Sequence, residues 1–186
     1  MGAKVGTISF WIIAVGTAFS HWPNVANARD PAPSAQNSVA MEESKTKNEA
    51  AIRELVDGFV KAIRGKEMNG VMSVFAPEVV SFDLGPPLQH GGGDEFKKRW
   101  QELFESYEGP IRYEVRDLSI TTGDDVAFSH SLNRISGTLK NGQRSDRWLR
   151  WTAGYQKTNG KWVIVHEQVS VPVDVKSGKA MMDLKP

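Results

Sequence analysis

A carboxylate and two histidines are the residues of this chain best suited to transfer protons. Asp83 follows the apolar segment 79–82 and precedes Gly85-Pro86-Pro87. A carboxyl group held in an apolar mouth has a raised pKa, which suits a general base. His130 and His166 fall on predicted strands among bulky apolar residues, where they would position a substrate or carry protons. The predicted catalytic residues are therefore Asp83, His130 and His166. The alternatives are a turn-capping role for Asp83 and a polar core network for the histidines.

Five further side chains are predicted to hold a small molecule. Ligand pockets combine an apolar, often aromatic lining with a few convergent polar groups. Three aromatic residues would supply the lining, and an arginine and a glutamine share the predicted inner sheet face; these are Trp100, Tyr113, Trp151, Arg134 and Gln168.

Composition and motifs exclude several other classes of function. The 186 residues contain 23 Lys and Arg, 22 Asp and Glu, and no Cys. The near-balanced charge lacks the basic footprint of a dedicated nucleic-acid binder, and the absence of Cys excludes thiolate nucleophiles and Cys-based metal sites. No HxH or HExxH spacing, no P-loop lysine after Gly91-Gly92-Gly93 and no GxSxG motif is present. We therefore expect no metal, no cofactor and no nucleic-acid partner.

Three helices are expected to come first. Thr46 and Glu49 have the spacing of a capping box, and apolar residues then recur with helical period up to Gly65. A second short helical stripe runs from Met68 to Phe75, before the strand at 79–83. A third helix follows Asp94 and ends before Gly109-Pro110, with its aromatic residues on one face.

From Ile111 the apolar period changes to two, which predicts strands. Four strands near 111–121, 125–139, 143–157 and 161–172 would form an antiparallel meander. A change of phase predicts a bulge near Arg116-Asp117. Asn141-Gly142 and Asn159-Gly160 are suited to two-residue type I′ turns.

These turns give a strand register. If Lys140 faces Gln143 and Thr158 faces Lys161, then Ala153 lies opposite both His130 and His166. A bulge would move some residues to the other face. The bulkier and more aromatic face is assigned to the helix-covered interior; it comprises Phe128, His130, Leu132, Arg134, Leu149, Trp151, Ala153, Tyr155, Trp162, Ile164, His166, Gln168 and Ser170.

The opposite face of the predicted sheet is too apolar for a free surface. It carries a row of valines together with Ile135 and Trp148. Such a face favours burial against a second copy of the chain, and hence a homodimer through the outer sheet face. The alternative is an ordinary half-solvated sheet.

The N-terminal residues predict export. Residues 1–28 contain Lys4, an apolar run from Val5 to Phe19, and Ala26-Asn27-Ala28, which is typical of a signal peptide cleaved after Ala28. The alternative is an uncleaved anchor helix, for which the run is short. Residues 29–45 are read as a flexible linker and 46–186 as the domain. We therefore expect a periplasmic or secreted protein with no membrane association after cleavage.

Three motifs in the domain resemble those of one known group of proteins. They are Asp83 with Pro86-Pro87, Arg150-x-Thr152, and the segment from Asn159-Gly160-Lys161-Trp162 through His166-Glu167-Gln168 to Ser170 and Pro172. With the order of elements, they resemble the nuclear transport factor 2-like superfamily and, within it, SnoaL-like or ketosteroid-isomerase-like bacterial proteins. The resemblance implies an α+β fold: a cone-shaped, curved antiparallel sheet wrapped by three N-terminal helices around a cavity for a small organic molecule, commonly in a dimer.

The resemblance also bears on single residues. Asp83 matches the proton-shuttling aspartate of the steroid isomerases, but Phe59 and Trp151-Thr152 stand where their two oxyanion donors would be. Gln168 replaces the second histidine of a His-x-His pattern. Classical ketosteroid isomerisation is therefore not expected.

The sequence thus predicts an exported domain with a small-molecule pocket. Acid–base chemistry of the isomerase, dehydratase or hydrolase type on a small apolar molecule is the first hypothesis. A non-catalytic ligand-binding domain and a dimerisation scaffold of the same fold are the alternatives.

Overall fold

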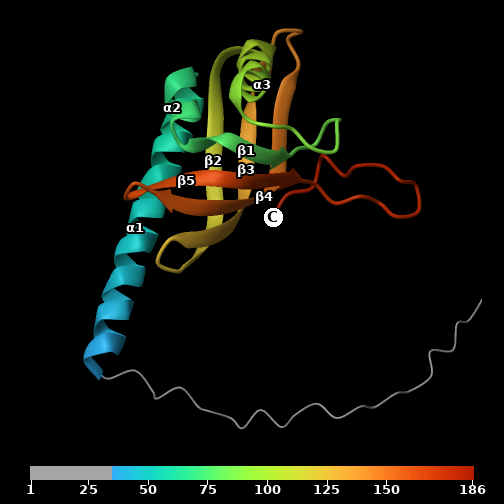
Figure 1. Ribbon diagram of the computed structural model, residues 1–186. Coiled ribbons are helices and arrows are strands. Elements are labelled where there is room, and N and C mark those ends of the chain that lie inside the picture. Colours follow the sequence, from blue (N-terminus) through green and yellow to red (C-terminus); the bar gives the residue numbers. More distant parts are fainter. Residues whose placement is uncertain (1–34) are drawn as a thin grey trace, which may run out of the picture. The chain divides into compact units, whose positions relative to one another are not determined.

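A computed structural model describes residues 35–186, which form a mixed α+β fold (Figure 1). Its elements follow one another as α1 (Ala35–Gly65), α2 (Met68–Met72), β1 (Phe75–Phe82), α3 (Gly93–Ser106), β2 (Tyr107–Thr122), β3 (Val126–Leu139), β4 (Arg144–Thr158) and β5 (Lys161–Ser170). The curved, unclosed sheet has the strand order β1-β5-β4-β3-β2. Strands β2 to β5 form the predicted antiparallel meander, whereas β1 joins the edge of β5 in parallel.

Helix α1 begins at Ala35, which corrects the prediction of a flexible linker up to residue 45. The segment from 36 to 45 is rich in good helix formers and contains no Gly or Pro, so helical propensity carries the helix outward beyond its packed part. Thr46 is consequently no N-cap: its hydroxyl donates to the carbonyl of Glu42 within the helix, at 3.0 Å. The predicted signal peptide lies outside the described residues. No helix between residues 35 and 186 is long and apolar enough to cross a membrane.

The predicted bulge in β2 is confirmed. The β2–β3 register shifts between Arg116 and Ser119, and Asp117 has a positive φ of 56°. The bulge lets Tyr113 and Ile120 both face inward although their positions have opposite parity.

The predicted register of the β3–β4 hairpin is wrong by one residue. Leu139 pairs with Gln143 around a loop of three residues, and Gly142 adopts the left-handed conformation with φ 79°. A three-residue loop that ends in a left-handed glycine is the next most common hairpin after the two-residue turn. His130 therefore pairs with Thr152 rather than Ala153. Because side chains alternate along a strand, the slip exchanges the two faces of β3.

The β4–β5 hairpin follows the predicted register only near its turn. Thr158 pairs with Lys161 and Tyr155 with Ile164, but beyond this point Ala153 pairs with Glu167. Val165 is the extra residue of a bulge, so the second half of β5 is turned over relative to the prediction.

Both irregularities change which residues face the core. Buried on the inner face are residues placed outside by the predicted register, namely Ser129, Ser131, Ile135 and Glu167. Exposed on the outer face are His130 and Gln168, and Arg134 lies there half-buried. Trp151, Ala153, Tyr155, Trp162 and Ile164 are buried as predicted. Arg150 and Thr152 are exposed on the outer face.

Helix α1 packs its apolar stripe against the inner face of the sheet. Phe59 lies at the centre of this contact and is 1% exposed. Its ring stands edge-on to those of Phe75 and Trp100, with centroids 5.5 Å away in both cases, and stacks on Trp151 at 5.7 Å. Aromatic contacts of this geometry add to the stabilisation from buried area. They join α1, β1, α3 and β4.

Gly92 lets α3 approach β1 closely. A Cβ atom at this position would lie 2.0 Å from the carbonyl oxygen of Pro77, whereas one at Gly91 would meet nothing within 4 Å. Helix α3 begins at the next residue, so its position against β1 depends on the missing side chain.

We expect Gly92→Ala to lower the free energy of unfolding by about 2 kcal/mol, because the new methyl group displaces backbone atoms. Gly91→Ala is the matched control and should change it by less than about 0.5 kcal/mol. Urea unfolding of both variants measures the difference. Equal effects at the two positions would contradict the close approach.

Candidate functional site

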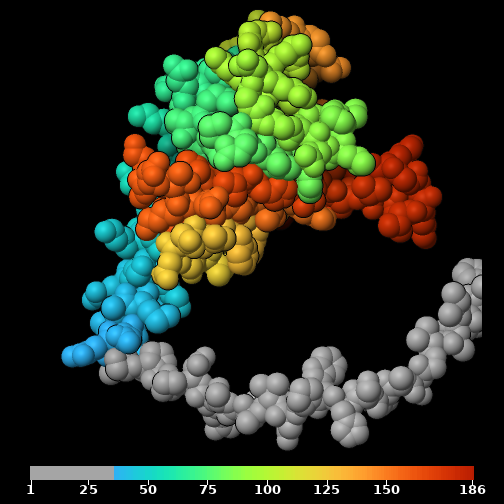
Figure 2. Space-filling model, in the orientation of Figure 1, coloured from blue at the N-terminus to red at the C-terminus, as the bar shows by residue number. Residues whose placement is uncertain are grey.

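A cavity of about 630 Å³ lies between α3, the loop after β1 and the inner face of the sheet. In the space-filling view, β1 and the segment after it (green) lie along β5 (orange-red), and α3 lies above them (Figure 2). Aromatic and aliphatic side chains make most of the lining, including Phe59, Phe96, Trp100, Leu103, Tyr113, Ile135, Leu149, Trp151 and Val169. The charged lining residues are Asp83, Glu95, Lys98, Arg99, Glu102, Arg147 and Glu167.

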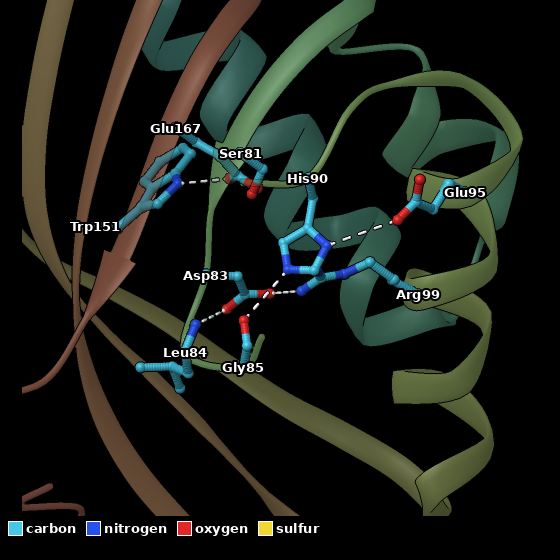
Figure 3. Close-up of polar contacts among 9 residues, drawn as sticks. All are labelled: Ser81, Asp83, Leu84, Gly85, His90, Glu95, Arg99, Trp151 and Glu167. Atoms are coloured by element: carbon cyan, nitrogen blue, oxygen red, sulfur yellow. Dashed lines mark hydrogen bonds and ion pairs between the residues drawn. The ribbon is translucent and has the colours of Figure 1, made fainter. Parts of the chain in front are cut away.

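Glu167 is a buried carboxyl group in this wall, 5% exposed. Its Oε1 accepts a hydrogen bond from the Ser81 hydroxyl at 3.0 Å, and its Oε2 accepts one from the indole N–H of Trp151 at 2.9 Å (Figure 3). The three residues come from β5, β1 and β4. The register that pairs Ser81 with Glu167 and Trp151 with Val169 brings them together.

The two hydrogen bonds differ in how they respond to protonation. Indole N–H can only donate, so Oε2 must remain an acceptor, whereas a serine hydroxyl can donate or accept. When Glu167 is protonated, the proton therefore sits on Oε1 and the Ser81 hydroxyl turns to accept it. Both charge states of the carboxyl group are satisfied without moving a heavy atom.

Burial raises the pKa of Glu167 to about 7, because the apolar surroundings penalise the carboxylate. The hydrogen bonds from Trp151 and Ser81 lower this pKa, the negative charge of Asp83 raises it, and Arg99 lowers it. A carboxyl group that titrates near neutral pH can both donate and accept a proton at that pH.

Asp83 and Arg99 form an ion pair at the cavity mouth. The Arg99 guanidinium donates to Oδ2 of Asp83, and the backbone N–H of Leu84 donates to Oδ1 at 2.6 Å (Figure 3). Both side chains are partly exposed, at 32% for Asp83 and 24% for Arg99. The pair joins the loop after β1 to α3 and places two opposite charges beside Glu167.

His90 is a buried histidine next to this pair. Its ring nitrogen Nε2 lies 3.3 Å from the carbonyl oxygen of Gly85, and Nδ1 lies 3.9 Å from a carboxylate oxygen of Glu95. Backbone hydrogen bonds between His90 and Ser81 fix the loop against β1. His90 therefore holds the loop that carries Asp83.

A second polar group lies on strands β2 and β3. The Ser131 hydroxyl donates to Oδ1 of Asn133 at 2.7 Å, and Nδ2 of Asn133 donates to the Tyr113 hydroxyl at 2.8 Å. All three residues are buried, and Tyr113 and Asn133 line the cavity. Burial raises the pKa of the Tyr113 hydroxyl, and the charge of Glu167 raises it further, so Tyr113 stays protonated.

Four of the predicted site residues line the cavity, namely Asp83, Trp100, Tyr113 and Trp151. The remaining predicted site residues do not line it. His130 and Gln168 are exposed on the outer sheet face, as the one-residue slip and the β5 bulge require.

Arg134 and His166 have structural partners elsewhere. Arg134 is paired with Asp146 through two hydrogen bonds of 2.8 Å. His166 is half-buried, its Nδ1 lies 2.9 Å from the carbonyl oxygen of Val80, and its ring stands edge-on to Phe82. The predicted two-histidine site is therefore not assembled.

The prediction missed Glu167, Arg99 and Asn133 as lining residues. Glu167 lies within the quoted His166-Glu167-Gln168 motif, and an acidic residue in a valine-rich strand is itself a signal of a buried acid. No group of three or more His, Asp or Glu side chains suited to a metal ion occurs between residues 35 and 186.

Comparisons with known proteins agree on one family. The SnoaL-like domain family matches residues 52–174. A nuclear transport factor 2-like protein of unknown function from Pseudomonas putida is 30% identical, with a TM-score of 0.69, over 76% of this chain and 98% of its own. None of the curated proteins compared with the chain matches it.

Two more distant structures share the fold. A ketosteroid isomerase-like protein from Erwinia carotovora has a TM-score of 0.56 at 21% identity, over 65% of this chain and 93% of its own. A protein from Streptomyces avermitilis proposed to be a dehydratase of the NTF2-like family has a TM-score of 0.62 at 14% identity, over 70% and 99%.

The buried Glu167 makes the stability of the fold depend on pH. Its pKa rises from an ordinary 4.5 to about 7 on folding, so the folded state binds this proton more tightly. The resulting stabilisation is complete below pH 4.5 and is lost as the pH rises through 7. Relative to Glu167→Gln, we expect the wild-type free energy of unfolding to fall by up to about 3 kcal/mol between pH 4.5 and 8.

Urea unfolding at several pH values measures this difference. Glu102→Gln, a change in an exposed carboxylate at the cavity rim, is the control and should track the wild type across the range. A constant difference between wild type and Glu167→Gln at every pH would contradict the raised pKa.

Proposed function

Since the chain belongs to the SnoaL-like domain family, we propose that it is an enzyme that moves a proton on a small organic molecule bound in the cavity. The observation that carries this proposal is Glu167, a carboxyl group with a pKa near 7 in an apolar cavity wall. Structural carboxylates of similar burial are normally paired with a cation, whereas both partners of Glu167 are neutral hydrogen-bond donors.

Glu167 has the properties of a general acid and base. As the carboxylate, it takes a proton from a C–H or O–H bond of the substrate and passes into its neutral form, with Ser81 turning to follow. It then returns the proton to another atom of the same molecule. Trp151 and Ser81 are positioning residues that hold the carboxyl group during both steps.

Asp83 and Arg99 would tune this transfer from the cavity mouth. Negative charge on Asp83 raises the proton affinity of Glu167. The positive charge of the Arg99 guanidinium would stabilise negative charge that builds up on the substrate. Isomerisation requires that a proton is removed from one atom of the substrate and returned to another. Dehydration requires that the removed proton is returned to a departing hydroxyl group, which leaves as water. The ketosteroid isomerase-like and dehydratase-type neighbours share the scaffold, which supports these two reaction classes over hydrolysis.

The test is proton exchange with solvent, followed by proton NMR in deuterium oxide on a panel of ring ketones and β-hydroxy ketones. We expect the wild type to replace substrate hydrogen by deuterium, or to eliminate water, with a rate that follows an apparent pKa near 7. Glu167→Gln should lower kcat by about 100-fold or more while the ligand still binds.

His130→Gln is the matched control, because His130 lies exposed on the outer sheet face and should leave kcat unchanged. If panel compounds bind in the cavity but undergo neither exchange nor elimination, the proposed enzymatic activity is contradicted and a ligand-binding domain is favoured. An unchanged kcat in Glu167→Gln would contradict the proposed role of Glu167 as general acid and base.

The expected export and homodimer stay predictions. Export rests on residues 1–28 alone. The homodimer is predicted in part from Ile135 and Val169, but in the structure Ile135 is buried in the core and Val169 packs against the core. It now rests on the outer-face side chains of Phe82 and Phe128, which are 39% and 49% exposed. Light scattering of the purified protein should give the mass of two chains, and a monomer that persists at high concentration would contradict the prediction.

A further inference from the structure

The hydroxyl group of Tyr113 has a proton to donate and no acceptor among the described residues. Its oxygen accepts from Nδ2 of Asn133, and no hydrogen bond from Tyr113 to another group is present in residues 35–186. The side chain is 8% exposed and lines the cavity. A buried donor without a partner costs free energy that a ligand oxygen can recover.

The neighbouring residues hold this donor in place. Oδ1 of Asn133 is engaged by Ser131, which turns the amide nitrogen toward Tyr113, and the second hydrogen on that nitrogen also has no acceptor in the described chain. Asn133 is 1% exposed and lines the same cavity. Two adjacent donors on β2 and β3 thus face one cavity, with Ser131 fixing their direction.

The surroundings define what kind of acceptor fits. The rings of Phe59 and Tyr113 lie edge to face with centroids 6.2 Å apart, and Phe59 in turn stacks on Trp151. The charge of Glu167 acts on Tyr113, and no cation is among the groups that shift its pKa. An anion beside Tyr113 would be repelled by the Glu167 carboxylate, and the lining cations Lys98, Arg99 and Arg147 are not among the groups that act on Tyr113.

We propose that Tyr113 and Asn133 form a subsite for an uncharged acceptor oxygen of the ligand, of the carbonyl class, carried on an apolar ring body. The inference names the ligand class of the site proposed above and relies on that proposal for its location. The ring body occupies the aromatic part of the cavity, and its carbonyl oxygen accepts from the Tyr113 hydroxyl.

Benzophenone and diphenylmethane test the subsite, because they have the same two rings and differ in the carbonyl oxygen. Benzophenone has no C–H bond next to its carbonyl group, so the enzyme cannot turn it over by proton abstraction. Calorimetry or thermal shift gives both Kd values. In Tyr113→Phe, the ratio of the benzophenone Kd to the diphenylmethane Kd should rise about tenfold over wild type.

Two controls separate this inference from the proposed function. Tyr155→Phe removes a buried tyrosine hydroxyl outside the cavity and should leave the ratio unchanged. His130→Gln changes a residue that is exposed on the outer sheet face and should also leave the ratio unchanged. If exchange activity is absent but the ratio depends on Tyr113, the subsite stands and the enzyme proposal fails; the reverse result overturns the subsite alone.

The wild type gives a further readout if Tyr113→Phe does not fold. The infrared carbonyl stretch of bound benzophenone should move to lower frequency than in an apolar solvent. An unshifted stretch, an unchanged Kd ratio in Tyr113→Phe, or no binding of benzophenone to the wild type would each overturn the proposal.

Discussion

The burial of one carboxyl group constrains the rest of this structure. Glu167 is hydrogen-bonded by side chains from β1 and β4, so three strands must keep their register for its two oxygens to be satisfied. A carboxyl group left in the same wall without those partners would cost several kcal/mol. Strand β1 pairs in parallel with β5 and thereby places the Ser81 hydroxyl beside Glu167.

The aromatic contacts around Phe59 stabilise a fold that contains both a buried acid and a large cavity. A cavity wall lacks packing partners on one side and so forfeits dispersion contacts. Phe59 restores contact from the other side, since its ring touches those of four residues on α3 and on strands β1, β2 and β4. Phe59, Trp100, Tyr113 and Trp151 of this cluster are also lining residues, so the same rings pack the core and form the cavity wall.

The elements could be predicted from periodicity, but the pairing of two hairpins could not. The helical stripe up to Gly65 and the change to period two at Ile111 predict the correct element types, and the phase change predicts the bulge at Asp117. Asn141-Gly142 fits both a two-residue and a three-residue loop, and that one-residue difference moved His130 from the predicted site to the outer face. Trp100, Tyr113 and Trp151 line the cavity because they lie on α3, β2 and β4, outside the two segments that the β3 slip and the β5 bulge turn over.

The bulge at Val165 determines which side chains in the second half of β5 face the cavity. Without it, β5 would present His166 and Gln168 to the interior and Glu167 to the outer face, as strict alternation requires. The bulge instead turns the acid inward, and the histidine packs against Phe82 on the outer face. A change of apolar phase marks the bulge in β2, whereas the bulge in β5 falls within the continuous apolar run from Trp162 to Val165. Such a run has no alternation whose phase could change, so the inward turn of Glu167 could not be predicted from the strand's own sequence.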